Sequence, residues 1–155
     1  MMAEAERRSA ARPPKETRHQ ARQAALQMLY QWEVGRLSMY EVRQTFWTHE
    51  TDAGGVLSDE LRAFATGLAD GVADSIGGID PLITEAAEHW RLERMNVMDR
   101  LILRLATYEF LHQPETPGKV IINEALELAR TFSGDDAVRF INGILDAIRK
   151  KLERE

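Results

Sequence analysis

At 155 residues, the chain is long enough for one domain with a substantial core, and its lack of cysteine excludes disulfides, thiolate metal sites and a cysteine nucleophile. No apolar run approaches the roughly 20 residues that cross a bilayer, and no apolar leader follows the N-terminal charges, which predicts a cytoplasmic protein without membrane attachment. The net charge of −5 argues mildly against nucleic acid as a partner of the whole surface.

The charge is unevenly distributed. Residues 1–22 contain six arginines or lysines against three glutamates, so they carry +3 and leave −8 for the remainder. A basic end on an acidic body can engage phosphates at one end and a basic partner elsewhere. For residues 1–14 a solvated, disordered basic arm is the simplest interpretation, and residues 15–155 are predicted to form one helical domain.

Apolar side chains recur at three- and four-residue spacing in almost every segment, which predicts helices. No strand alternation or internal repeat emerges, and the short apolar run at residues 120–122 leads directly into a helical pattern. The sequence therefore predicts an all-α domain of about seven helices. In chain order, the predicted helices cover residues 17–34, 38–47, 58–76, 80–93, 96–111, 119–132 and 133–153.

Cap residues predict the helix boundaries. Gly35 ends the first helix, whose opening turns are expected to project Arg18 and Arg22 together. The most apolar helix, residues 96–111, is expected to be central and buried. Residues 49–57 are expected to form the most flexible internal loop. The predicted helix starts are Thr17, Ser38 in a capping box with Glu41, Ser58, Asp80 followed by Pro81, Asn96, and Ser133 in a capping box with Asp136.

Several glycines lie inside or at the ends of these helices. Gly67 and Gly71 are four residues apart, which suggests that a neighbouring helix approaches closely there. The pair Gly77 and Gly78 is expected to close the third helix. Gly143 lies within the last helix, where glycine costs about 1 kcal/mol relative to alanine, so a tight helix crossing is the expected compensation.

Motifs for catalysis or metal binding are weak. Two Glu-x-x-His pairs, Glu16 with His19 and Glu109 with His112, have the spacing used by di-iron helical bundles. The first pair lies in a basic turn that repels a dication, and the second lies at a helix end, so chance is the simpler account. Catalytic and phosphate-loop signatures are missing from the sequence. We therefore expect no enzyme activity, no cofactor and no metal.

RNA binding is better supported, because single-stranded RNA needs cations along its backbone and flat groups on which bases stack. Arg18, His19 and Arg22 supply the cations. Most of the candidate rings, Tyr30, Trp32, Phe132 and Phe140, are assigned to the core by periodicity. Phe140 follows Arg139 and lies one turn beyond Asp136, which is also compatible with a partly exposed ring beside a cation and an acceptor.

Three stretches in order, "ARQAALQMLYQWE", "MDRLILRLATYEF" and "KVIINEALELARTFSGDDAVRFINGILD", closely resemble the NusB family of bacterial transcription antitermination factors. The resemblance runs from about residue 18 to residue 148 and is weakest over residues 36–80. It implies two packed helical bundles that bind the single-stranded boxA element of nascent RNA together with the ribosomal protein NusE. The pair would anchor an antitermination complex on RNA polymerase during ribosomal RNA transcription, without catalysis.

The same resemblance implies roles for individual residues. The family's arginine-rich helix start matches Arg18, His19 and Arg22, which would contact phosphates and base edges. Its acidic, basic and aromatic patch at the start of the last helix matches Asp136, Arg139 and Phe140, and Phe140 would offer a ring to a base. On the NusE side, the resemblance points to Tyr30 and Asp99.

The sequence departs from the family pattern in one respect, and two alternative functions remain open. The arginines of the arm are spread out among glutamates and prolines, so affinity for RNA alone is expected to be weak and dependence on NusE pronounced. The protein could instead be a helical scaffold or homodimer without RNA affinity. A ribosomal RNA methyltransferase with a similar helical part would need a cofactor-binding domain and a cysteine that this sequence lacks.

Overall fold

The computed structural model describes residues 15–48, 57–88 and 90–155. The predicted disordered arm of residues 1–14, most of the predicted loop of residues 49–57, and His89 lie outside the described residues. Within them the chain is helical without strands, which confirms the all-α prediction. The elements are α2 (Lys15–Val34), α3 (Met39–Phe46), α4 (Asp59–Asp74), α5 (Ile76–Ala87), the short 3-10 helix η1 (Leu92–Arg94), α6 (Val97–His112), α7 (Gly118–Phe132) and α8 (Asp135–Lys151).

Three of the predicted helix caps are confirmed. Ser38 forms a full capping box with Glu41 at the start of α3. Ser58 accepts a hydrogen bond from the amide of Leu61 at the start of α4, and Asn96 accepts one from the amide of Met98 at the start of α6. Each cap satisfies a backbone donor that the first turn leaves unpaired.

The predicted boundary before α5 is wrong. The helix begins at Ile76, so Gly77 and Gly78 lie in its first turn and Pro81 lies inside it. Asp80 is not a cap, because its carboxylate accepts two hydrogen bonds of 2.9 Å from Arg104 on α6. A tertiary ion pair therefore takes the side chain that local sequence assigned to capping.

The predicted start of the last helix at Ser133 is also wrong. Ser133 ends α7, and Gly134 precedes α8 with a φ of 125°, a conformation that glycine adopts at little cost. The hydroxyl of Ser133 donates to Oδ1 of Asp99 at 2.6 Å instead of capping α8. The side chain therefore connects the end of α7 to the start of α6.

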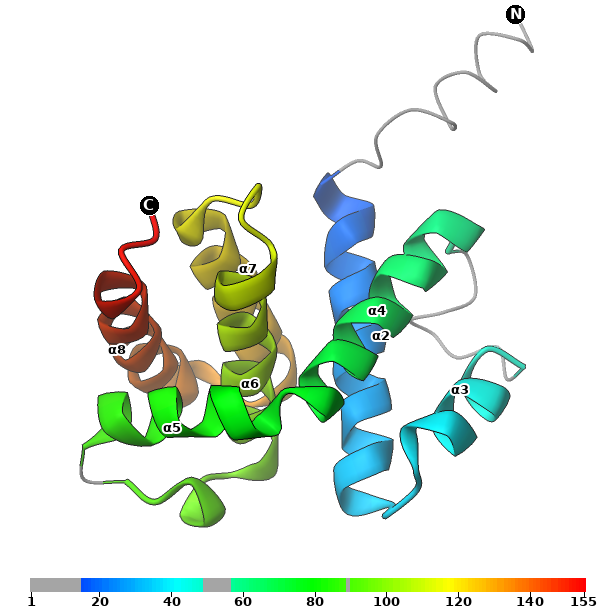
Figure 1. Cartoon of the computed structure of the whole chain (residues 1–155), viewed down its shortest axis with the longest axis horizontal. Helices are drawn as coiled ribbons and strands as arrows, with labels where there is room; N and C mark the ends of the chain where they lie inside the picture. Colours follow the sequence, from blue (N-terminus) through cyan, green and yellow to red (C-terminus); the bar gives the residue numbers. More distant parts are fainter. Residues whose placement is uncertain (1–14, 49–56, 89) are drawn as a thin grey trace, which may run out of the picture.

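The helices form two packed groups, as predicted (Figure 1). The first contains α2, α3 and α4, and the second contains α5, α6, α7 and α8. Helix α6 lies at the centre, contacting α2 and α4 of the first group and α5, α7 and α8 of its own, and its residues 101–107 are all buried. The expected central position of this segment is confirmed.

Two sets of ion pairs join α2 to α6 at different heights. Near the start of α2, Arg22 pairs with Glu109, and near its end Glu33 pairs with Arg100 at 3.0 Å and Arg104 at 3.3 Å. Increasing residue numbers on α2 match decreasing numbers on α6, so the two helices run antiparallel. The two levels of charge pairing hold the first group against the second.

The glycine expectations are only partly met. A Cβ on Gly71 would overlap the ring of Tyr108 on α6, so any larger residue there would force that side chain to shift. A Cβ added to Gly67 or to Gly143 would meet no atom within 4 Å, so the expected tight approach at these two glycines is wrong. The described helices include none that combines the length and apolar character needed to cross a membrane.

Candidate nucleic-acid interface

The first turns of α2 carry the three cationic residues that the sequence pattern assigned to RNA. Arg18 is half-buried, and no other described residue pairs with its side chain. Arg22, one turn later, is only 3 % exposed. The expectation that the two arginines project together from the helix is therefore wrong, and of these two side chains only that of Arg18 is unpaired among the described residues.

Arg22 is held by carboxylates from two helices. Its Nε lies 3.0 Å from Oε2 of Glu109 and its Nη2 lies 2.7 Å from Oε1, which is a bidentate pair, and Nη1 lies 4.0 Å from Glu124. Its guanidinium also lies 5.5 Å from the ring centroid of Phe64. Because these partners occupy its donors in the interior, Arg22 stabilises the fold and is not available to phosphates.

The charges around Arg22 keep it ionised. Burial by itself lowers the pKa of an arginine, since it removes water from the charged form. The hydrogen bonds to Glu109 and the negative charges of Glu109 and Glu124 outweigh burial, so the pKa of Arg22 is raised above its ordinary value. The pair is therefore a permanent charge contact between α2 and α6.

His19 is fixed on both sides of its ring. Nδ1 lies 2.6 Å from Oε2 of Glu124 on α7. On the other side of the ring, Nε2 lies 3.4 Å from the side-chain Nε2 of Gln23, one turn along α2. Its side chain remains 24 % exposed. A base or phosphate that used His19 would have to share it with Glu124, whereas the side chain of Arg18 pairs with no described residue.

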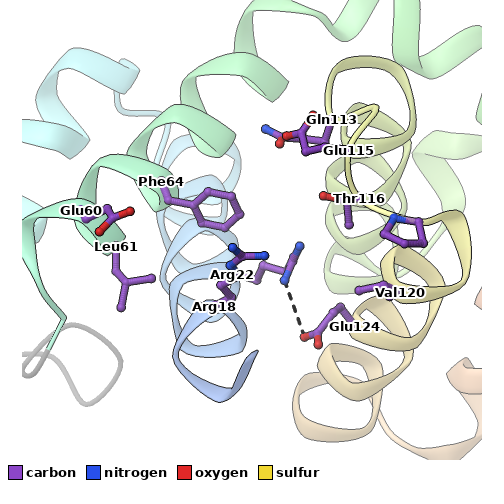
Figure 2. A pocket seen from close by; sticks show the side chains of 11 residues that line it. Arg18, Arg22, Glu60, Leu61, Phe64, Gln113, Glu115, Thr116, Val120 and Glu124 are labelled. Carbon is purple, nitrogen blue, oxygen red and sulfur yellow. Dashed lines mark ion pairs between the residues drawn. The ribbon is translucent and has the colours of Figure 1, made fainter. Parts of the chain in front are cut away.

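A cleft of about 530 Å³ opens beside these residues, between α2, α4 and the segment that joins α6 to α7. Figure 2 shows Phe64 of α4 pointing toward Arg22, with Glu124 of α7 on the other side of the guanidinium. The cleft is lined by three carboxylates and two guanidinium groups, and one of these guanidinium groups, that of Arg22, is already paired. The lining residues are Arg18, Arg22, Glu60, Leu61, Phe64, Gln113, Glu115, Thr116, Pro117, Val120 and Glu124.

A second hollow of about 380 Å³ lies at the start of α8. Of the predicted patch, Asp136 and Phe140 line it, whereas Arg139 is exposed next to it on the same helix without lining it. Asp99, which the resemblance assigned to the partner protein, lines the same hollow. The remaining lining residues are Trp90, Arg94, Met95, Asn96, Ser133 and Ala137.

Trp90 and Arg94 in this hollow are residues that sequence reasoning missed as candidates. Trp90 is 56 % exposed, and its ring centroid lies 5.5 Å from that of Phe140. One sequence feature could have identified Trp90 as a candidate. It is a tryptophan within the polar run "EHWRLER", just beyond an amphipathic segment, where the helical periodicity does not assign the ring to the core. Proximity to Phe140 could not be predicted, because 50 residues separate the two in sequence.

Tyr30 lies on the opposite end of α2 from Arg18. It is 41 % exposed and lines a shallow hollow of about 350 Å³ with Gln27, Gln31 and Met98. Met98 directly precedes Asp99 on α6, so the structure brings both predicted partner-binding residues to the region where the end of α2 meets the start of α6.

The cationic start of α2 and the hollow at the start of α8 do not form one pocket. Helix α7 connects them, because its Glu124 contacts His19 and Ser133 at its C-terminal end contacts Asp99. Nine residues of helix separate these contacts, which corresponds to about 13 Å. An extended ligand that touched both would have to span at least this distance.

Comparisons with known proteins point to one family. A family model described as the NusB family matches residues 19–150. The transcription antitermination protein NusB of Koribacter versatilis is 46 % identical over 139 residues, covering 90 % of this chain and 92 % of the relative. The protein of the same name from Sorangium cellulosum is 42 % identical over 137 residues, covering 88 % and 94 %.

Solved structures agree with this result. A structure of T. maritima NusB superimposes with a TM-score of 0.77 at 32 % identity, covering 90 % of this chain and 93 % of that one. A structure of the antitermination factors NusB and NusE in complex with dsRNA gives a TM-score of 0.77 at 22 % identity, covering 88 % and 98 %. At that identity the second match shows the fold alone.

Proposed function

Since the chain belongs to the NusB family, we propose that it is a transcription antitermination factor that binds boxA RNA together with ribosomal protein NusE. The complex helps to anchor the antitermination machinery on RNA polymerase during ribosomal RNA transcription. The observation that carries the proposal is the family match over residues 19–150, which spans the chain from His19 on α2 to Lys150 on α8.

The proposed RNA surface combines a cation on a fixed helix with an aromatic hollow. Arg18 has no partner among the described residues, and α2 beneath it is locked to α6 by the buried pair of Arg22 and Glu109. A cation on a rigid support loses little conformational entropy when it binds. His19, Asp136, Arg139 and Phe140 complete the proposed surface, and Arg22 acts on it only by holding the helix.

Residues 1–14 are proposed to add phosphate contacts next to Arg18. This segment contains Arg7, Arg8 and Arg12, and it joins α2 directly at Lys15. Each phosphate contact to a single strand lowers the slope of log affinity against log salt by about 0.7. Deletion of residues 1–14 should therefore make binding weaker and less dependent on salt.

The proposed NusE surface contains Tyr30 and Asp99. Tyr30 presents an exposed ring at the junction of α2 and α6, and Asp99 contributes a carboxylate from the first turn of α6. Residues 23–155 carry the net charge of −8 that follows the basic start of the chain. Such a body favours association with a basic partner protein.

The proposed role is binding in the cytoplasm, without catalysis. Within the described residues, no group of three or more histidine, aspartate or glutamate side chains is arranged to hold a metal ion. The solved complex of NusB and NusE contains double-stranded RNA. We assign unpaired RNA to this chain because exposed rings contribute most when the bases are free to stack on them.

Fluorescence anisotropy with a labelled boxA RNA tests the proposal. The RNA is titrated with this chain, with NusE and with an equimolar mixture, and a duplex and a scrambled single strand serve as controls. The mixture should bind boxA more tightly than either protein alone, and Tyr30→Ala should reduce the gain that NusE provides. If no RNA binds under any of these conditions and the chain is dimeric by light scattering, the scaffold alternative replaces the proposal.

A further inference from the structure

Trp90 is exposed without an evident structural reason. It follows α5, and 56 % of its surface is accessible, whereas Trp32 and Trp47 are half-buried against the core. No described residue accepts a hydrogen bond from its indole Nε1. An exposed tryptophan costs the folded chain apolar area in water, so a ligand that covers the ring would recover this free energy.

The ring of Trp90 forms a corner with Phe140. The two centroids lie 5.5 Å apart and the ring planes are inclined at 74°. In this arrangement a planar ligand can stack on one ring while its edge meets the other. Phe140 packs partly against the core, so Trp90 is the ring with more free surface.

The hollow beside this corner has room for a planar heterocycle and carries a free cation. Its volume is about 380 Å³. Arg94, on η1, lines it and is exposed, and its side chain pairs with no described residue. A guanidinium in this position can neutralise a phosphate next to a base that occupies the corner.

We infer that Trp90, Phe140 and Arg94 form a stacking site for one unpaired nucleobase, with Trp90 as the main platform. This inference rests on the proposed RNA-binding function and extends its surface from α8 onto the α5–η1 segment. An RNA base fits better than an apolar peptide side chain, because the hollow combines two rings with a free cation and with the carboxylate of Asp136.

Stacking has a signature that differs from phosphate binding. Every base has a π-face, so a stacking site tolerates a change of base but not removal of the base. A stacking residue also contributes equally at low and high salt, whereas a phosphate contact changes the salt slope. These two properties separate the role of Trp90 from that of Arg18.

The experiment uses the full chain with NusE and the boxA RNA. Trp90→Ala should weaken binding about tenfold with an unchanged salt slope, and Trp90→Phe should recover most of the affinity because it retains a ring. Tyr40→Ala is the matched control, since Tyr40 is 63 % exposed on α3, away from the hollow. Thermal unfolding of each variant verifies that the fold is retained.

Abasic nucleotides locate the base. Each position of the RNA is replaced in turn by an abasic unit, and we expect one position whose replacement weakens the wild-type complex but not the Trp90→Ala complex. Replacement by another base at that position should have little effect. RNA should also quench the tryptophan fluorescence of the wild-type chain more than that of Trp90→Phe.

Failure of the inference and failure of the proposed function give different results. If Trp90→Ala binds as tightly as the wild type while Arg18→Ala binds more weakly, the stacking site is wrong and RNA binding stands. If Trp90→Phe is as weak as Trp90→Ala, a ring at this position is not sufficient for binding and the inference is also wrong. If the wild-type chain binds no RNA with or without NusE, the proposed function itself fails.

Discussion

Arg22 on α2 and Glu109 on α6 form a buried bidentate ion pair, with Nη2 and Oε1 2.7 Å apart. The residues are 87 positions apart in the sequence, and both are less than 4 % exposed. The pair ties the first turns of α2 to the central helix. The free cation Arg18 therefore projects from a helix whose position is fixed by its own next turn.

Arg22→Ala should lower the free energy of unfolding by about 3 to 5 kcal/mol, because it leaves Glu109 buried without its partner. Urea denaturation followed by circular dichroism measures the change. Arg43→Ala is the matched control, since Arg43 forms a more exposed pair with Asp70 and should cost less than about 1 kcal/mol. Equal losses in the two variants would contradict the buried role of Arg22.

Arg18→Ala should weaken RNA binding and reduce the steepness of its salt dependence by about 0.7, since one phosphate contact is lost. The free energy of unfolding should remain within about 0.5 kcal/mol of wild type, because no described residue pairs with this side chain. Anisotropy titrations at several salt concentrations measure the slope. A weaker affinity with the original slope would show that Arg18 does not contact a phosphate.

Gly71→Ala should destabilise the protein by about 1 to 3 kcal/mol, because its Cβ would overlap the ring of Tyr108. Gly67→Ala, one turn earlier on α4, meets no atom within 4 Å and should stabilise the helix by up to about 1 kcal/mol. Thermal unfolding compares the two variants. The same sign of change in both would argue against close packing of Tyr108 on α4.

Arg154→Ala should loosen the segment between α6 and α7. Its guanidinium donates to the carbonyl of Phe110 in the last turn of α6 and to the carbonyls of Gln113 and Thr116 in the segment that follows. The carbonyl of Gln113 also accepts from the backbone amide of Thr116. We expect a loss of about 1 to 3 kcal/mol and faster amide exchange in residues 113–117. Arg154→Lys should recover only part of the lost stability, since lysine lacks the planar guanidinium that donates to several carbonyls at once. Unchanged exchange would contradict this capping role.

Asp146 provides a pH-dependent prediction. Hydrogen bonds from Arg149 and Lys150 lower the pKa of its carboxyl below the ordinary value. A lowered folded-state pKa stabilises the fold above the unfolded pKa of about 3.9, and this contribution is lost as the pH falls through the folded value. Asp146→Asn should therefore cost up to about 0.5 kcal/mol at pH 7 and progressively less as the pH falls below about 3.9. Urea denaturation across this pH range checks the trend.

Local patterns predicted the elements well where the decisive contacts are themselves local. The caps at Ser38, Ser58 and Asn96 each involve an amide two or three residues away, so sequence spacing was sufficient to identify them. Asp80 and Ser133 carry equally good local signals. Their side chains bond instead to Arg104 and Asp99 on α6, which no local pattern contains.

In the candidate site, too, local spacing predicted the contacts within one helix but not those between distant segments. Spacing placed Asp136, Arg139 and Phe140 together on one helix, and Asp136 and Phe140 line one hollow. The pairing of Phe140 with Trp90 joins two segments 50 residues apart, and it required the packing of α5, η1 and α8. Two arginines in neighbouring turns of one helix, Arg18 and Arg22, could not be separated into an open cation and a buried one by their own sequence.

By itself, the amino-acid sequence determined that the chain is helical, where three of its helices begin, and that positive charge gathers at one end. These properties depend on backbone propensity, on capping and on the number of charged residues in a segment, and each of these can be read from a few neighbouring residues. Only the tertiary structure decided which charged groups remain available. A buried carboxylate such as Glu109 requires a cationic partner, and the partner it takes depends on which side chain the helix packing brings within hydrogen-bonding distance.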